Sequence, residues 1–194
     1  TVVYLIFNEG YHATHQGSLV REDLLEEALR LGKMLVDSET TRHTDAFALL
    51  ALMCFHAARA HGRIDAAGRM LTLKEQDRAK WNRELIEQGN TYIHQASIGD
   101  HLSFYHVEAA IAYEHVTAAS FAATNWSRIL QLYEWLYQIK PDAVVALNRA
   151  IARAEAEGPA AALTELLDIE SNGQLQNYYL LYASLGEIHA RMGN

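Results

Sequence analysis

The chain has 194 residues, of which 50% are apolar and 21% charged, so it is long enough for a sizeable core and is not intrinsically disordered. Its net charge of −8 excludes a chain that grips a nucleic-acid backbone unaided, because phosphate contacts need a surplus of lysine and arginine. The scarcity of proline and the abundance of alanine, leucine, glutamate and arginine favour helix over sheet.

The apolar period of three to four residues recurs along the whole chain and predicts an all-α protein. We expect five helices in the first 120 residues. The third should be the most buried, because it is apolar on nearly every side between Phe47 and Phe55. The fourth should begin near Glu75, whose acidic side chain suits the positive end of a helix dipole, and Ser103 should cap the fifth. The expected ranges are 2–11, 21–36, 44–61, 75–96 and 103–119.

The last third of the sequence predicts two similar pairs of helices, at 126–138 with 142–157 and at 159–169 with 175–192. An offset of 34 residues, the tetratricopeptide repeat length, aligns Ile129 with Leu163 and Leu147 with Leu181. We therefore expect a bundle of about nine helices that continues into a right-handed, tetratricopeptide-like array. The bundle should cover residues 1–120 and the array residues 121–194. They should form one continuous body, because no linker rich in Pro, Gly or Ser separates them.

Two features bear on the compartment. The single cysteine, Cys54, cannot form an internal disulfide, as is usual in the reducing cytoplasm. The longest apolar stretch, residues 46–58, contains His56 and is shorter than the roughly 18–20 residues that cross a bilayer. We expect a cytoplasmic protein without a membrane partner. The sequence begins within a helical pattern and without methionine, so we expect it to be part of a longer protein.

The histidines do not predict a metal site. His12 and His15 have a possible ligand spacing but no carboxylate pair beside them, and His101 and His106 are five residues apart, which separates their rings on one helix. A nucleophile elbow, a phosphate-binding glycine loop and a dinucleotide motif are also absent from the sequence. We expect no metal, no cofactor, no catalytic residues and no enzyme activity.

The most distinctive segment is the polar stretch that ends at Trp81. Asp65 and Gly68 are expected to form a turn in which the glycine takes a positive φ. Because polar loops on a rigid scaffold often carry recognition, we interpret this stretch as a contact site. The alternative, that its side chains only hold the loop against the following helix, stays open. The predicted contact residues are Asp65, Gly68, Glu75, Gln76, Asp77, Arg78 and Trp81.

A second polar group lies near the start of the chain, at Asn8 and Glu9. A buried Glu9 would need a partner such as Arg59 or Arg78, because an unpaired buried charge is costly. We therefore expect a structural cluster of Asn8, Glu9 and Arg59, held by a salt bridge rather than used in catalysis.

Several segments together resemble one known protein family. They are Phe-Asn-Glu-Gly-Tyr at 7–11, Gln-Asp-Arg-x-x-Trp at 76–81, Asn-Trp at 125–126 and Val-Val-Ala-Leu-Asn-Arg-Ala at 144–150. Their order is similar to the C-terminal extension of a group of bacterial extracytoplasmic-function sigma factors, over nearly the whole chain. Ala66, Ala67, Lys74 and Asn82 depart from the family's usual residues.

The resemblance implies a helical regulatory module of a sigma factor whose polymerase-binding and promoter-reading domains precede Thr1. The implied partners are those N-terminal sigma domains and the RNA polymerase core, with DNA reached only through the preceding domains. The module would modulate transcription initiation by contact, and its acidic body would suit basic DNA-binding surfaces.

Two further hypotheses belong to other classes. The first is a small-molecule-sensing helical domain that controls the attached sigma factor, with its ligand between the repeat helices and the central bundle. The second, which we favour least, is a helical enzyme with Glu9, a histidine and Arg78 together in a deep cavity.

Overall fold

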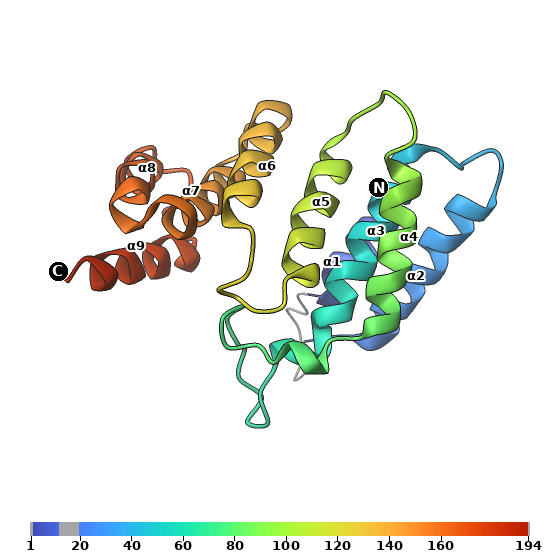
Figure 1. The fold of residues 1–194 in the computed structure, drawn as a ribbon, viewed down its shortest axis with the longest axis horizontal. Helices are drawn as coiled ribbons and strands as arrows, with labels where there is room; N and C mark the ends of the chain where they lie inside the picture. The colour runs from blue at the N-terminus through green and yellow to red at the C-terminus, as the bar shows by residue number, and fades with distance from the viewer. Residues whose placement is uncertain (1, 12–19, 194) are drawn as a thin grey trace. The chain divides into compact units, whose positions relative to one another are not determined.

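The computed structural model describes residues 2–11 and 20–193, and within these ranges the regular structure is entirely helical, as predicted. The chain divides into two compact units, Thr1–Thr124 and Asn125–Asn194. Figure 1 shows the helices in chain order, from α1 in blue to α9 in red. The first unit contains α1 (Val2–Tyr11), α2 (Glu22–Asp37), α3 (Thr44–Arg59), α4 (Arg83–Ala96) and α5 (Phe104–Thr117), with short 3-10 helices η1 (Ala60–Arg63) and η2 (Arg78–Lys80) between α3 and α4.

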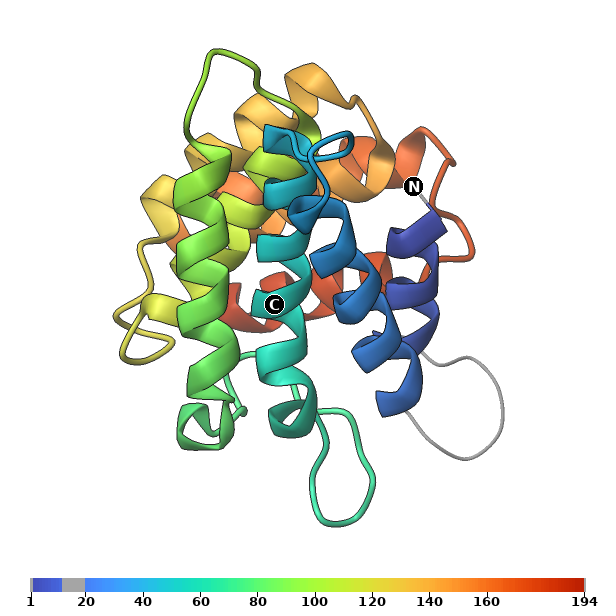
Figure 2. The same ribbon diagram turned by 90° about the vertical axis from the view of Figure 1, so that its right-hand side faces the viewer.

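Helix α3 is the centre of the first unit. It packs against α1, α2, α4 and α5, and every residue from Ala48 to Phe55 is buried. Figure 2 shows α3 between α2 and α4. The prediction that the third helix is the most buried one is therefore confirmed, since an all-round apolar helix is stable only when its neighbours cover each of its faces.

Two glycines allow α2 and α4 to approach α3 closely. A Cβ atom at Gly32 of α2 would lie 2.7 Å from Met53 Cε, and one at Gly89 of α4 would lie 2.5–3.0 Å from three atoms of the Phe55 ring. A larger residue at Gly89 would force the Phe55 ring or α4 to move, whereas at Gly32 the flexible end of Met53 would have to shift.

The fourth helix begins at Arg83 and not near Glu75, so that prediction was wrong. The side chain of Asn82 accepts a hydrogen bond from the main-chain N of Leu85 at 3.1 Å and caps α4. Glu75 and Asp77 do not lie in the first turn of α4, because the Glu75 carboxylate bonds back to Thr72 and the Asp77 carboxylate caps the 3-10 helix η2. Elsewhere the predicted helices agree with the structure to within about two residues, apart from the last, which starts at Tyr179, four residues later than expected.

The second unit contains two consecutive helix pairs, in which each helix packs on the next. They are α6 (Trp126–Ile139) with α7 (Ala143–Glu157), and α8 (Pro159–Ser171) with α9 (Tyr179–Met192). Helix α8 begins 33 residues after α6, and α9 begins 36 residues after α7, close to the predicted offset. Leu147 and Leu181, which that offset aligns, are both buried in the core of this unit.

Ion pairs join the first three helices of the second unit. Glu165 of α8 accepts hydrogen bonds from Arg149 and Arg153 of α7, at 2.6 Å and 3.1 Å. Arg153 also reaches Glu134 of α6 at 3.4 Å. These side chains are half-buried, which reduces screening by salt and makes the network more stabilising than separate surface pairs.

In the described ranges, no helix is both long enough and apolar enough to cross a membrane.

The close approach at Gly89 leads to a stability prediction. Gly89→Ala should lower the free energy of unfolding by about 1–2 kcal/mol, because overpacking against the buried Phe55 ring outweighs the better helix propensity of alanine. The matched control is Gly186→Ala in α9, where no heavy atom lies within 4 Å of the added Cβ, and it should be stabilising by about 1 kcal/mol. Urea unfolding of both variants measures the effect. Equal gains in both would contradict the packing described at α3 and α4.

Candidate interaction site

The segment between α3 and α4, residues 60–82, is referred to below as the strap. It begins with η1, turns back on itself in the teal loop of Figure 1, and returns through η2 to the start of α4. An antiparallel bridge joins Ile64 and Met70, and Leu71 N donates to Arg63 O at 2.7 Å. At its end, Asn82 N donates to Ala58 O of α3 at 2.9 Å. The strap is therefore held by main-chain hydrogen bonds along its length.

The tip of the strap is the turn predicted at Asp65 and Gly68. Gly68 has φ 78° and donates its N–H to Asp65 O at 3.0 Å. The Asp65 carboxylate accepts from the main-chain N of Arg69 and Ala67 and also pairs with the Arg69 guanidinium at 2.8 Å. The main-chain N–H of Arg69 contributes most to lowering the pKa of Asp65 below its ordinary value. The carboxylate therefore stays ionised and fixes the tip conformation.

Glu75 and Asp77 also stabilise the strap locally. The Glu75 carboxylate accepts from Thr72 Oγ1 at 2.7 Å and from Thr72 N at 2.8 Å, and these bonds lower its pKa. Asp77 accepts from the main-chain N of Ala79 at 3.0 Å and caps η2. Both residues remain exposed to solvent.

Arg78 attaches the strap to α5. Its Nη1 donates to the main-chain oxygens of His115 and Ala118, at 2.5 Å and 2.8 Å, and its Nη2 donates to Thr124 Oγ1 at 3.3 Å. The first two oxygens lie at the C-terminal end of α5, where helix carbonyls lack intrahelical partners and the helix dipole is negative. Arg78 therefore caps α5 and also holds the segment that leads from it to residue 124.

Trp81 packs the end of the strap onto α3. It is 3% exposed, and its ring centroid lies 4.7 Å from Arg78 Cζ and 5.4 Å from Arg59 Cζ, both within cation–π distance. A Cβ at Gly62 would be 2.8 Å from two atoms of this ring, so only glycine lets it lie there. The buried Gln76 completes the contact by donating to Leu71 O at 3.2 Å and accepting from Arg59 at 3.4 Å.

Arg63 attaches the beginning of the strap to α1. Its side chain is buried, its Nη1 donates to Tyr11 O at 2.9 Å, and its Cζ lies 3.8 Å from the Tyr11 ring centroid. The two ends of the strap thus contact the C-terminal ends of two different helices through arginines.

The histidine beside Arg78 is neutral over the physiological pH range. Burial, with smaller contributions from Arg59 and Arg78, lowers the pKa of His115 to about 3. Because the folded state resists protonation here, His115 contributes stability that is fully present above its unfolded pKa of about 6.5 and is lost as pH falls toward 3. An imidazole with such a pKa is not poised for acid–base catalysis near pH 7.

The structure separates the seven predicted contact residues into two groups. Gln76, Arg78 and Trp81 face the bundle and hold the strap in place, whereas Gly68, Glu75 and Asp77 are exposed and Asp65 is partly so. The first group therefore has the packing role that the alternative interpretation expected. That the second group contacts a partner stays a prediction. Sequence reasoning missed the exposed Arg69, Lys74 and Lys80, which a count of basic residues along this segment would have found.

The second predicted cluster is not formed as expected, because Glu9 is exposed. The helical period places Phe7 and Tyr11 on the face of α1 that packs on α3, which leaves Glu9 on another face. Arg59, its expected partner, instead contacts Gln76 and Trp81. Asn8 is half-buried and forms a hydrogen bond with the Tyr4 hydroxyl.

No three His, Cys, Asp or Glu side chains in the described ranges are arranged to hold a metal ion. His101 and His106 have ring centroids 6.2 Å apart, and both lie near Asp45, with N–O distances of 3.3 Å and 3.6 Å. His12 and His15 fall outside the described residues.

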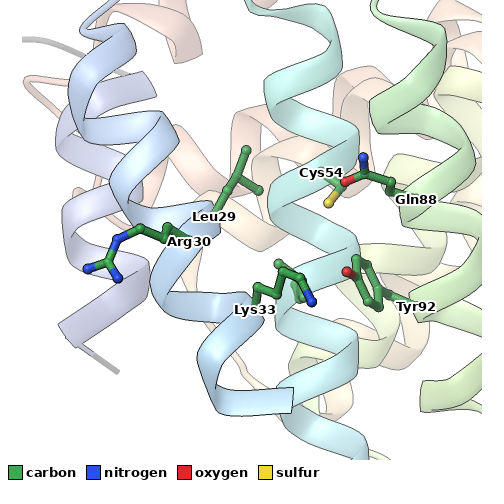
Figure 3. A pocket seen from close by; sticks show the side chains of 7 residues that line it. Leu29, Arg30, Lys33, Cys54, Gln88 and Tyr92 are labelled. Carbon is green, nitrogen blue, oxygen red and sulfur yellow. The ribbon is translucent and has the colours of Figure 1, made fainter. Parts of the chain in front are cut away.

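A small groove of about 170 Å³ lies between α2, α3 and α4. Figure 3 shows Cys54, Gln88 and Tyr92 on its α3 and α4 sides, with Arg30 of α2 pointing away from them. Burial raises the pKa of the Cys54 thiol to about 12, so the thiol is protonated and unreactive at neutral pH. Both cations of the groove are engaged, Arg30 with Glu27 at 2.7 Å and Lys33 with Asp37 at 2.8 Å.

Residues 1–97 match the model of a family described as "Family of unknown function (DUF6596)". The chain belongs to the DUF6596 family. It is also 36% identical over 185 residues to an uncharacterized protein of Rhizobium meliloti (strain 1021), in a match that covers 95% of this chain and 43% of that protein. The chain thus spans less than half the length of this curated relative. No solved structure matches it. The DUF6596 match extends from α1 to α4 and contains the whole strap.

The three acceptors of Arg78 give a test of its attachment role. Arg78→Ala should lower the free energy of unfolding by about 1–3 kcal/mol, because helix-end carbonyls lose a charged donor. It should also speed cleavage by chymotrypsin after Phe121, which lies in the segment that Arg78 holds. The control is Arg83→Ala, an exposed residue that should change stability by less than about 0.5 kcal/mol. Equal stability and equal cleavage rates in the two variants would show that Arg78 does not anchor the strap.

Proposed function

We propose that this chain is a regulatory interaction module of an extracytoplasmic-function sigma factor. It acts by contact, either with the sigma domains of the same polypeptide or with the RNA polymerase core, and it has no catalytic role. The observation that carries the proposal is the strap. The Gln-Asp-Arg-x-x-Trp segment, which is part of the resemblance to these sigma factors, supplies the residues that hold the strap and expose its tip.

A preformed tip favours recognition of a macromolecule. The hydrogen bonds of Asp65 and the Ile64–Met70 bridge fix the conformation of the turn. Ala66, Ala67 and Gly68 at the end of the turn are exposed. Because the tip is already ordered, little conformational entropy is lost when a partner binds it. The length of the R. meliloti relative leaves room for further domains beside a module of this size.

Arg78 supplies a route from the strap to the rest of the chain. It bonds both to the end of α5 and to Thr124, and the second unit begins at the next residue. A partner that displaces the strap would weaken these bonds and release residues 118–124. Contact at the tip would then change the order of the segment that follows α5, which is a physical basis for regulation without catalysis.

Two ionisable groups of the first unit support a non-catalytic role. His115 is neutral across the physiological range because of its lowered pKa, and the Cys54 thiol is protonated because of its raised pKa. Neither is an activated base or nucleophile at neutral pH.

The test is promoter-dependent transcription by a sigma factor that carries this chain as its C-terminal part, with core polymerase. The variant Asp65→Ala/Arg69→Ala removes the tip ion pair and should change transcript yield by about fivefold or more, the range of a typical coupling between sites. The matched control is Arg21→Ala/Asp23→Ala, which removes another exposed ion pair of the first unit, and it should leave the yield unchanged.

Circular dichroism of both double variants establishes that they remain folded. If the tip variant is folded and transcribes at the rate of the unmodified protein, the strap has no part in transcription and the proposed function fails.

A further inference from the structure

The strap is a basic segment in an acidic chain. From Arg59, the last residue of α3, to Arg83, the first of α4, there are seven of the 16 lysine and arginine residues and three of the 24 acidic residues. This segment has a net charge of +4, whereas the rest of the chain has −12. The local charge is therefore opposite in sign to the charge of the whole protein.

The three carboxylates of the segment are engaged by the strap itself. Asp65 accepts from two main-chain N–H groups and from Arg69, Glu75 accepts from Thr72, and Asp77 accepts from the main-chain N of Ala79. These bonds fix turns, and none of the three carboxylates forms an ion pair with Lys74 or Lys80 in the described part of the chain.

Three of the cations are not used by the fold. Lys74, Lys80 and Arg83 are exposed, and none of them forms an ion pair or a side-chain hydrogen bond with another residue in 2–11 or 20–193. Lys80 and Arg83 also lie near the N-terminus of α4, where the helix dipole disfavours positive charge. Folding therefore does not account for these residues.

The inward-facing arginines add to the positive potential. In the described part of the chain, Arg63 and Arg78 contact main-chain oxygens, a hydroxyl, a sulfur and aromatic rings, and no carboxylate lies within 4.0 Å of either guanidinium. The positive charge of each guanidinium is therefore not neutralised by an ion pair. Partial burial makes that charge less screened than it would be in open solvent.

We propose that Lys74, Lys80 and Arg83, the exposed cations that the fold does not use, form a basic surface that binds an acidic segment of a protein partner. This proposal rests on the proposed function, in which the strap is the contact site. It adds the chemical class of the partner. A protein segment is favoured over nucleic acid for two reasons. A long polyanion would be repelled by the −12 charge of the remaining chain, and the exposed Met70 beside the surface suits an apolar side chain rather than a phosphate.

The experiment is fluorescence anisotropy with the 194-residue chain at about 50 mM salt. One probe is a labelled peptide of about ten residues, mostly glutamate with two leucines, and the other is a single-stranded oligonucleotide of similar charge. The peptide should bind more tightly than the oligonucleotide, and its affinity should fall as salt rises. Lys74→Glu/Lys80→Glu/Arg83→Glu should weaken peptide binding by about tenfold or more.

The matched control is Arg21→Glu/Arg30→Glu/Lys33→Glu, which makes the same change in net charge at the N-cap of α2 and along that helix, and it should alter binding by less than about twofold. Equal loss in both triple variants, no binding of the peptide, or tighter binding of the oligonucleotide would each overturn the proposal. Because the assay contains neither polymerase nor promoter, its result is independent of the transcription test. Binding without any effect on transcription would leave the basic surface in place and remove the sigma-factor role.

Discussion

The arrangement of the first unit depends on one arginine that reaches from a loop to the end of a helix. The guanidinium of Arg78 satisfies two carbonyl oxygens at the end of α5 and the Thr124 hydroxyl while it stacks on Trp81. A guanidinium has enough donors, in a fixed plane, to do this, whereas a lysine ammonium has fewer and no flat face. The strap, α5 and the approach to the second unit are therefore positioned by the same side chain.

Arginine side chains also donate hydrogen bonds to main-chain oxygens at the C-terminal ends of other helices of this protein. Arg63 donates to the last residue of α1, and Arg42 donates to Val36 O at 3.0 Å and Asp37 O at 3.3 Å at the end of α2. In each case a cation meets the negative end of a helix dipole and unpaired carbonyls together. Several basic residues that could be assigned to binding from the sequence thus stabilise helix ends. Lys74 and Lys80 have no such role in the fold.

The helices were predictable because their signal is local. The apolar period predicted the ends of α1 and α3 to within two residues, and the third helix was expected at the centre because it is apolar on nearly every side. The start of α4 was not predictable from acidic residues, because Glu75 and Asp77 suit a helix start and a turn equally well. That Asn82 is the N-cap of α4 was shown only by the structure, in which its side chain accepts a hydrogen bond from Leu85 N. Glu9 was misjudged for a similar reason, since its burial depended on which face of α1 meets α3.

The strap was predictable as an unusual polar segment, but which of its residues are buried and which are exposed was not. The unusual order of its polar residues indicated this segment. The sequence of residues does not by itself show that Gln76 and Trp81 are buried while Lys74 and Lys80 are exposed. That distinction depends on Gly62, which leaves room for the Trp81 ring, and on carbonyls of α5 that are 37 and 40 residues away from Arg78.

The central claim is that the strap is an ordered part of the bundle, and amide hydrogen exchange of the 194-residue chain tests it most directly. The amides of Asp65, Leu71 and Asn82 donate to main-chain oxygens, so they should exchange many times more slowly than the same residues in an unstructured peptide. Exchange of all three at the unstructured rate, while the amides of α3 remain protected, would contradict the account.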